Sequence, residues 1–333
     1  MHRKRHDGGE SQRLSEIRRG VRRGRTAIGR ALTRLAAAVA LPLLLASCAT
    51  GSTAPVRSPS DPAATADPPG ADTVRVVTWN IFGGNDLERR SNLERVAAVI
   101  DTLHADIVLL QEVDRLTARS GRVDQAAVLA AATGFHVVFG KSIDHGGGEY
   151  GNAILSRWPV QTSRIVPLDS LLPPELAAGV QEARTLLHIV VETPAGPLHV
   201  GNTHLDHRAT SPLRQPQALA LLAYLADAVP PGAAMVLGGD LNALPDAVEV
   251  RALGSRFTDA WIACGAGPGF TFRADRPDRR IDYVLFSAVS CVSARVLDRP
   301  LSDHLPVVVD LVIGRSRAVG NGAAGYGPNI PDR

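Results

Sequence analysis

Apolar and polar positions follow two different periods along residues 73–314, and together they predict a mixed α/β domain. Val74–Trp79 is rich in β-branched residues and stops at Asn80, which is typical of a buried strand. Asn92–Leu103 repeats its apolar residues at helical spacing and predicts a helix. Strand-like and helix-like stretches continue to follow one another without an internal repeat, so we expect a single α/β domain.

The other predicted elements are short apolar runs bounded by turn residues, and longer stretches with helical spacing. The predicted strands are Ile107–Leu110, Phe135–Phe139, Asn152–Leu155, Leu186–Val191, Leu198–Asn202, Met235–Leu237, Tyr283–Phe286, Val292–Val296 and Val307–Val312. The predicted helices are Gln125–Ala132 and Leu213–Asp227. Pro194-Ala195-Gly196 separates two of the strands and predicts a hairpin.

Polar residues recur at one place in this pattern, directly after an apolar strand stops. Asn80, Glu112, His204, Asp240 and Asn242 all occupy such positions. Functional side chains are often carried where a rigid strand gives way to a loop. If these strand ends share one edge of the sheets, their side chains converge in one cleft.

The N-terminal segment differs from the rest in composition. Residues 1–34 hold 11 Lys/Arg and 3 Asp/Glu, the apolar stretch Leu35 to Leu45 follows, and Leu45-Ala46-Ser47-Cys48 comes next. A basic head, an apolar stretch and small residues before a break predict a signal peptide over residues 1–47. The last four residues resemble the bacterial lipoprotein processing box, which predicts lipidation of Cys48; an ordinary signal peptide with an incidental cysteine is the alternative.

The segments on either side of the domain are poor in large apolar residues. Residues 48–72 predict a flexible tether and the Gly-rich residues 315–333 a disordered tail. We therefore expect an exported lipoprotein that is anchored to a membrane through Cys48 and faces the extracytoplasmic side. The sequence indicates no particular protein partner. An exported domain can carry a disulfide, but the sequence leaves open whether Cys264 and Cys291 pair or stay free.

The charge of the chain argues against a broad nucleic-acid-binding face. The net charge of +3 comes from the leader, because the residues after position 34 include 25 basic and 30 acidic side chains. A basic stripe that binds nucleic acid by counterion release is not supported by this balance. Only a local basic cluster could serve that purpose.

Carboxylates and amides in the strand-end positions predict a site for a hard divalent cation, which prefers oxygen ligands. Gly238-Gly239 allows a close backbone approach just before Asp240 and Asn242. Taken alone, this segment would be a turn, and a solitary Glu112 would be a helix cap or a surface charge. Only the combination points to a site.

Histidines supply the second part of the predicted chemistry. His204 could stabilise charge on a phosphate or transfer a proton, whereas His207 is expected to be an exposed loop residue. A zinc site is the competing interpretation, but cysteine ligands are absent and the acids favour a harder ion. Asp282 could fix which imidazole nitrogen of His304 faces the substrate; alone, it would equally well pair with Arg280.

Six motifs occur in an order that resembles the endonuclease/exonuclease/phosphatase superfamily. They are Thr78-Trp79-Asn80, Gln111-Glu112, Asn202-Thr203-His204, Gly239-Asp240-Leu241-Asn242, Arg280-Ile281-Asp282-Tyr283 and Ser302-Asp303-His304. The resemblance spans about residues 73–314. It implies a four-layer sandwich of two mixed β-sheets flanked by helices, and a metal-dependent phosphoesterase that uses Mg²⁺ or Mn²⁺.

The resemblance also implies a role for each residue. Glu112 would be the principal metal ligand, with Asn80 and Asp303 at or near the ion, and Asp240 would align or deprotonate the attacking water. His204 and His304 would donate to phosphate oxygens, Asp282 would orient His304, and Asn242 would bind phosphate. Tyr150 and Asn152 would line the cleft, and Arg184 would be a substrate-side or a structural arginine. One principal metal is expected, because too few acids are present to hold two ions closely.

Two differences from the family's abasic-site repair nucleases narrow the range of expected activities. Phe82 occupies the place of their second acid, and His204 stands where they have tyrosine. His204 is instead similar to the secreted deoxyribonuclease, sphingomyelinase and phosphatase branches. We expect a phosphodiester substrate, in nucleic acid or in a lipid headgroup; an inositol-phosphate phosphatase and a binding protein without turnover are the alternatives.

Overall fold

The computed structural model describes residues 73–314. The predicted signal peptide, lipidation site at Cys48, tether and tail lie outside the described residues. Within residues 73–314, no helix combines the length and the apolar character needed to cross a bilayer.

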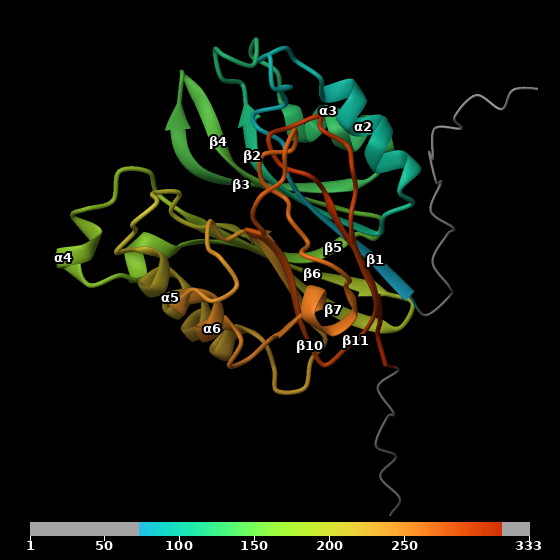
Figure 1. Ribbon diagram of the computed structural model, residues 1–333, viewed down its shortest axis with the longest axis vertical. Helices are drawn as coiled ribbons and strands as arrows, with labels where there is room; N and C mark the ends of the chain where they lie inside the picture. The colour runs from blue at the N-terminus through green and yellow to red at the C-terminus, as the bar shows by residue number, and fades with distance from the viewer. Residues whose placement is uncertain (1–72, 315–333) are drawn as a thin grey trace, which may run out of the picture. The chain divides into compact units, whose positions relative to one another are not determined.

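Two six-stranded sheets form the centre of this unit (Figure 1). The first sheet has the order β11-β12-β1-β2-β4-β3. Its strands are β1 (Thr73–Asn80), β2 (Ile107–Arg115), β3 (His136–His145), β4 (Gly148–Ser156), β11 (Ser290–Val296) and β12 (Val307–Val312). β1 and β2 run parallel and all other neighbours are antiparallel, so the sheet is mixed.

The second sheet has the order β5-β6-β7-β8-β10-β9. Its strands are β5 (Val160–Pro167), β6 (Thr185–Thr193), β7 (Gly196–His204), β8 (Met235–Asp240), β9 (Thr258–Asp259) and β10 (Asp282–Ser287). Here β7 and β8 are the parallel pair, and the other neighbours are antiparallel. Each sheet therefore has one parallel pair near its middle.

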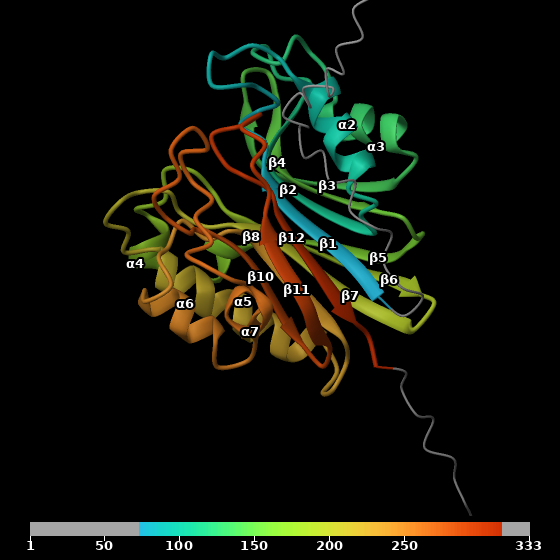
Figure 2. The same ribbon diagram turned by 45° about the vertical axis from the view of Figure 1, so that its right-hand side comes forward.

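Helices cover the outer face of each sheet (Figure 2). α2 (Leu93–Thr102) and α3 (Gln125–Thr133) pack on the first sheet, and α5 (Arg214–Ala228) and α6 (Val248–Leu253) pack on the second. Three short segments complete the elements of residues 73–314: η1 (Leu168–Leu171), α4 (Pro174–Ala177) and α7 (Ala260–Cys264).

Three apolar cores hold these four layers together. Between the sheets, Leu109 of β2 packs in one buried cluster with Val200 of β7 and Val236 of β8. A second cluster joins α2 and α3 to the first sheet, and a third joins α5 and α6 to the second. Burying this apolar area is the main favourable term of folding. The predicted four-layer sandwich of two mixed sheets flanked by helices is confirmed.

Two details bear on residues or questions raised by the sequence analysis. β2 does not end at Glu112 but continues to Arg115, because a bulge between Leu110 and Val113 lets the strand resume its pairing with β4. Cys264 and Cys291 form a disulfide, which joins α7 to β11. The question that the sequence left open is thus answered for these two cysteines.

Strand register explains why the polar residues meet. In the first sheet Asn80, the last residue of β1, lies opposite Gln111, where the parallel pairing of β1 and β2 ends. In the second sheet Asp240 lies opposite both His204 of parallel β7 and Asp282 of antiparallel β10. The two parallel pairs pack against each other across the central core. One edge of the sandwich therefore collects the strand ends.

A buried pair of histidines in the second sheet should make the fold sensitive to acid. His188 is buried and its imidazole contacts His199 and Tyr224 at 3.1 Å each. Burial lowers the pKa of His188 to about 4, and the neighbouring His199 adds to the shift. Between pH 6.5 and 4 the unfolded chain therefore binds more protons than the folded chain, so folding stability falls as the pH falls.

We expect the free energy of unfolding to drop by roughly 2 kcal/mol between pH 7 and pH 4.5 through His188. His188→Gln removes this titrating group and should remove most of that difference. Urea unfolding at the two pH values measures it, with His136→Gln, an exposed position on β3, as the matched control. An unchanged pH dependence in His188→Gln would contradict the assignment.

Candidate active site

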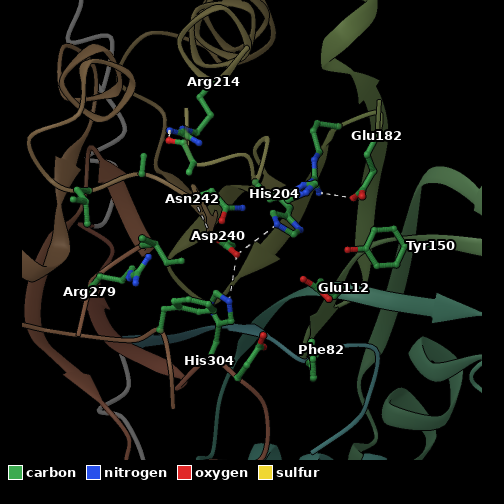
Figure 3. A pocket seen from close by; sticks show the side chains of 18 of the residues that line it. Phe82, Glu112, Tyr150, Glu182, His204, Arg214, Asp240, Asn242, Arg279 and His304 are labelled. Carbon is green, nitrogen blue, oxygen red and sulfur yellow. Dashed lines mark hydrogen bonds and ion pairs between the residues drawn. The ribbon is translucent and has the colours of Figure 1, made fainter. Parts of the chain in front are cut away.

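A cavity of about 970 Å³ opens at the edge where the strand ends meet (Figure 3). Eight of the predicted site residues line it: Glu112, Tyr150, Arg184, His204, Asp240, Asn242, Asp303 and His304. Asn80 and Asp282 lie directly behind the wall and are hydrogen-bonded to residues that line it. The structure therefore brings ten of the predicted residues to one place.

Asn152 differs from the expectation. It is buried, it donates a hydrogen bond from its amide to the carbonyl of Thr185 at 3.3 Å, and it does not line the cavity. In this position the side chain ties β4 to β6, between the two sheets. Its predicted place in the cleft is wrong, because β4 turns this side chain toward the sheet interface.

Asn80 connects the two acids on either side of it. Its Nδ2 donates to Glu112 Oε1 at 3.0 Å and to Asp240 Oδ2 at 3.2 Å, while its Oδ1 accepts from the backbone N–H of Phe82 at 3.1 Å. Hydrogen bonds from a neutral amide favour the charged form of both acids. Asn80 thus sets the spacing between Glu112 and Asp240.

Asp240 lies at the centre of the site. Its Oδ1 accepts the backbone N–H of Asn242 at 2.8 Å, and its Oδ2 lies 3.5 Å from His204 Nε2 and 3.6 Å from His304 Nε2. Burial raises the pKa of Asp240 to about 7, and the charge of Asp282 adds to the rise, although His304 opposes it. A carboxylate with such a pKa is suited to accept a proton near neutral pH.

His304 is held by a second carboxylate. Its Nδ1 lies 2.8 Å from Asp282 Oδ2, which leaves Nε2 directed toward Asp240 and the cavity. Burial alone would lower the pKa of His304, but Asp282 and Asp240 raise it to about 10, so the imidazole carries a positive charge at neutral pH. Arg280 pairs with Asp259 at 2.8 Å instead of Asp282, which excludes the alternative left open by the sequence.

His204 has the opposite electrostatic character. Burial lowers its pKa well below the usual value, and the positive charges of Arg184 and His304 act in the same direction. The two imidazoles beside Asp240 are therefore one neutral and one charged. Pairs of titratable groups whose environments separate their pKa values are typical of acid–base sites.

Backbone geometry places Glu112 and Asn242 in unusual conformations. Glu112 has a φ of 58° in the bulge of β2, and Asn242 has a φ of 49° just after β8. Left-handed conformations of residues other than glycine cost of order 1–3 kcal/mol and cluster at functional sites. The carbonyl of Glu112 accepts the N–H of Gly83 at 3.0 Å, which holds the bulge in place.

The glycine pair before Asp240 is required by close packing. A Cβ at Gly238 would lie 2.6 Å from a methyl group of Leu109 in the facing sheet. Gly239 has a φ of 138°, and a Cβ there would lie 1.8 Å from the carbonyl oxygen of Thr203. Without these two glycines β8 could not approach β7 and the first sheet closely enough to present Asp240 at this position.

The donor set at the cavity wall fits a hard divalent cation. Burial raises the pKa of Glu112, the charge of Asp303 adds to the rise, and burial likewise raises the pKa of Asp303. Two carboxylates that disfavour each other's charge in one cavity are matched to an oxygen-seeking cation.

A second group could also hold a metal, since ligand atoms of Asp240, Asp282 and His304 lie within 4.8 Å of one another. Asp282 does not line the cavity, however, and its hydrogen bond occupies Nδ1 of His304. Asp240 and His304 of this group do line the cavity, but Glu112 and Asp303 line it without belonging to the hydrogen-bonded group, so they are the carboxylates left for an entering ion.

The family of the chain follows from a comparison with known families. A model described as the endonuclease/exonuclease/phosphatase family matches residues 77–304. The chain belongs to this family. Its members are hydrolases that act on phosphate ester bonds and generally use divalent metals. The prediction of a metal-dependent hydrolase of phosphate esters is therefore confirmed for the general class of reaction.

Three similar proteins illustrate how far the likeness extends. A solved endonuclease/exonuclease/phosphatase structure from Beutenbergia cavernae is 32% identical with a TM-score of 0.62, covering 73% of this chain and 72% of that chain. The uncharacterized protein YbhP of Escherichia coli K12 is 29% identical over 259 residues, 71% of this chain and 95% of its own. A mannosyl-6-phosphatase from Bacteroides thetaiotaomicron, 17% identical with a TM-score of 0.57, covers 72% of this chain and 100% of its own; this likeness shows the fold alone.

Several residues of this family member line the cavity without having been predicted. They include Arg89, Arg119, Glu182, Arg214, Phe272 and Arg279. His207 is exposed as expected, yet it also lines the cavity and its Nδ1 lies 3.0 Å from Arg184 Nη2. These residues sit in loops and at helix ends, where no apolar run signals them. For the four arginines, the sequence signal that could have found them is the density of arginine near the six motifs; Glu182 and Phe272 leave no such signal.

Proposed function

We propose that this protein hydrolyses a phosphodiester with water, in a divalent-metal-dependent reaction in which Asp240 orients the attacking water. The observation that carries the proposal is the position of Asp240, whose Oδ2 lies within 3.6 Å of two imidazoles and accepts from the amide that also binds Glu112. A water bonded to Asp240 would have a proton acceptor on one side and cationic or polar donors around its target.

The metal contributes a defined part of this chemistry. Mg²⁺ or Mn²⁺ held by Glu112 and Asp303 would supply positive charge that polarises the phosphoryl group and offsets its repulsion of the nucleophile. Asn80 keeps Glu112 at a fixed distance from Asp240 through its two amide hydrogen bonds. That spacing sets the orientation of the water relative to the phosphorus.

The protein's own donors would stabilise the charge that develops on the phosphate. His304 is protonated and points Nε2 into the cavity, so it would donate to a phosphate oxygen. His204 is neutral and can donate from its N–H or accept a proton. Preorganised donors of this kind are usually the largest single contribution to such reactions.

We further propose that the enzyme acts outside the cytoplasm, anchored by a lipid on Cys48. The basic and apolar leader supports this location. The disulfide between Cys264 and Cys291 supports it independently, since disulfides persist in oxidising compartments. Retention of the protein in the detergent-soluble membrane fraction, and its release by Cys48→Ala, would test the anchor.

The substrate is proposed to be nucleic acid or a lipid headgroup. Arginines on the cavity wall favour a nucleic-acid strand, whereas a lipid anchor would hold the enzyme at a bilayer and favour a headgroup. The test is hydrolysis of plasmid DNA, sphingomyelin, phosphatidylinositol and inositol phosphates with Mg²⁺ or Mn²⁺.

Salt separates DNA from the zwitterionic sphingomyelin in that panel. Cleavage of DNA should weaken steeply as ionic strength rises, because binding releases counterions. Attack on a zwitterionic headgroup should change little with salt. Hydrolysis of none of these substrates, nor of bis-p-nitrophenyl phosphate, would reject the proposed function.

A further inference from the structure

Three arginines on the cavity wall are each stacked on an aromatic ring that lines the same cavity. Arg89 lies over Phe82 with 3.8 Å from its guanidinium carbon to the ring centroid. The corresponding distances are 5.3 Å for Arg119 over Tyr150 and 5.2 Å for Arg279 over Phe272. Stacking on a ring face holds a guanidinium in place without neutralising it.

Arg89 differs from the other two in its charge balance. Arg119 pairs with Asp114 and Arg279 pairs with Asp278, each at 2.8 Å. Arg89 is exposed and makes no ion pair within residues 73–314. Of the three stacked guanidiniums it is therefore the one whose charge is left for a ligand.

The loop that carries Arg89 is held in a defined conformation. Phe82 and Arg89 both have positive φ angles, 52° and 61°. The carboxylate of Asp86 accepts the backbone N–H groups of Glu88 and Arg90 at 3.0 and 2.9 Å, so it closes the loop around Arg89. Strain of this kind persists only where the surrounding contacts enforce it.

This loop is also joined directly to the catalytic centre. The backbone N–H of Phe82 donates to Asn80 Oδ1 at 3.1 Å, and Asn80 binds both Glu112 and Asp240. Figure 3 shows the Phe82 ring on the Glu112 side of the cavity, across from Arg214. The stacked pair therefore flanks the position proposed for the scissile phosphate, and does not occupy it.

The size of the cavity leaves room for a ligand that reaches this pair. Its volume of about 970 Å³ lies at the upper end of the roughly 300–1,000 Å³ typical of small-molecule sites. His204, His304 and an ion held by Glu112 and Asp303 would contact the scissile phosphate. The unpaired guanidinium of Arg89 on the rim is suited to bind a second anionic group of the same substrate.

We propose that Arg89, seated on the ring of Phe82, binds a second phosphate of the substrate, separate from the phosphate that is hydrolysed. This inference rests on the proposed function and narrows its substrate class to phosphoesters with an additional phosphate group. An internucleotide strand and a phosphorylated lipid headgroup both provide that group. A choline headgroup does not, and Arg89 would repel its ammonium.

Ligand binding tests the inference without requiring turnover. Wild-type protein with Mg²⁺ should bind thymidine 3′,5′-bisphosphate about 10-fold more tightly than thymidine 5′-monophosphate by calorimetry, as expected for one charged contact. In Arg89→Gln this ratio should fall to nearly 1. Glycerophosphoinositol 4-phosphate against glycerophosphoinositol forms the second arm, and the larger of the two ratios identifies the nucleotide or the headgroup as the source.

Two further variants make the result specific. Arg256→Gln is the matched control, since Arg256 stacks on Phe257 at 5.8 Å but does not line the cavity, and it should keep the wild-type ratio. Phe82→Leu should lower the ratio, because Arg89 loses its platform. Equal affinity of the wild type for both members of each pair, or an unchanged ratio in Arg89→Gln, would overturn the inference.

The proposed function is tested separately, in the same protein preparations, by measuring hydrolysis of bis-p-nitrophenyl phosphate. Hydrolysis without a preference for the second phosphate would leave the proposed function standing and reject the role of Arg89. A preference that Arg89→Gln removes, without any hydrolysis, would support the binding role and reject the proposed function.

Discussion

Asp240→Asn is expected to lower kcat for bis-p-nitrophenyl phosphate by about 1,000-fold. The substitution keeps the size of the side chain but removes the carboxylate that would orient the water and accept its proton, a contribution typically worth about 10²–10⁴-fold. It also replaces an acceptor that Asn80 and the Asn242 N–H both use. Steady-state kinetics with saturating Mg²⁺ measures the effect.

The control for this loss must show that the fold is intact. Asp227→Asn changes an exposed acid on α5 and should leave kcat within about twofold, since surface substitutions away from a site are usually small in effect. The circular dichroism spectrum and the thermal unfolding midpoint of Asp240→Asn should be those of a folded protein. A folded Asp240→Asn variant with more than a tenth of the wild-type rate would exclude Asp240 as the residue that positions the water.

Glu112→Gln is expected to act mainly through the metal. Replacing the carboxylate by an amide removes one negative charge from the proposed ligand set, and even residues one shell farther from a metal typically change its affinity by 10–100-fold. We therefore expect the Mg²⁺ concentration for half-maximal activity to rise by at least about 100-fold. Titration of chelator-treated protein with Mg²⁺, followed by rate measurement, determines this concentration.

The matched control is Glu94→Gln, an exposed acid in the first turn of α2. It should leave the Mg²⁺ requirement unchanged. If Glu112→Gln lowered the maximal rate but kept the wild-type Mg²⁺ requirement, Glu112 would have a role other than holding the ion.

Much of the framework could be predicted, because buried strands and amphipathic helices leave clear periods in the sequence. β1 and β8 are apolar up to the residues that enter the site, so Asn80 and Asp240 were identifiable as strand-end residues. The six motifs then indicated the family. β5, by contrast, is an edge strand whose side chains are mostly exposed, and it leaves no apolar run to detect.

The parts that could not be predicted depend on contacts between distant segments. The bulge that carries Glu112 exists because β2 resumes its pairing with β4 after Leu110, a property of the partner strand and not of the local sequence. Arg119 meets Tyr150 only because β4 folds back on β2. Asn152 was misplaced for the same reason, since only the second sheet decides which face of β4 is buried.

The most direct test of a single metal-dependent hydrolytic centre is the rate of bis-p-nitrophenyl phosphate hydrolysis by chelator-treated protein, before and after Mg²⁺ or Mn²⁺ is added back. We predict no hydrolysis above background in excess EDTA, and recovery of the full rate when the ion is restored. Hydrolysis that continued at the original rate in excess EDTA would contradict the account.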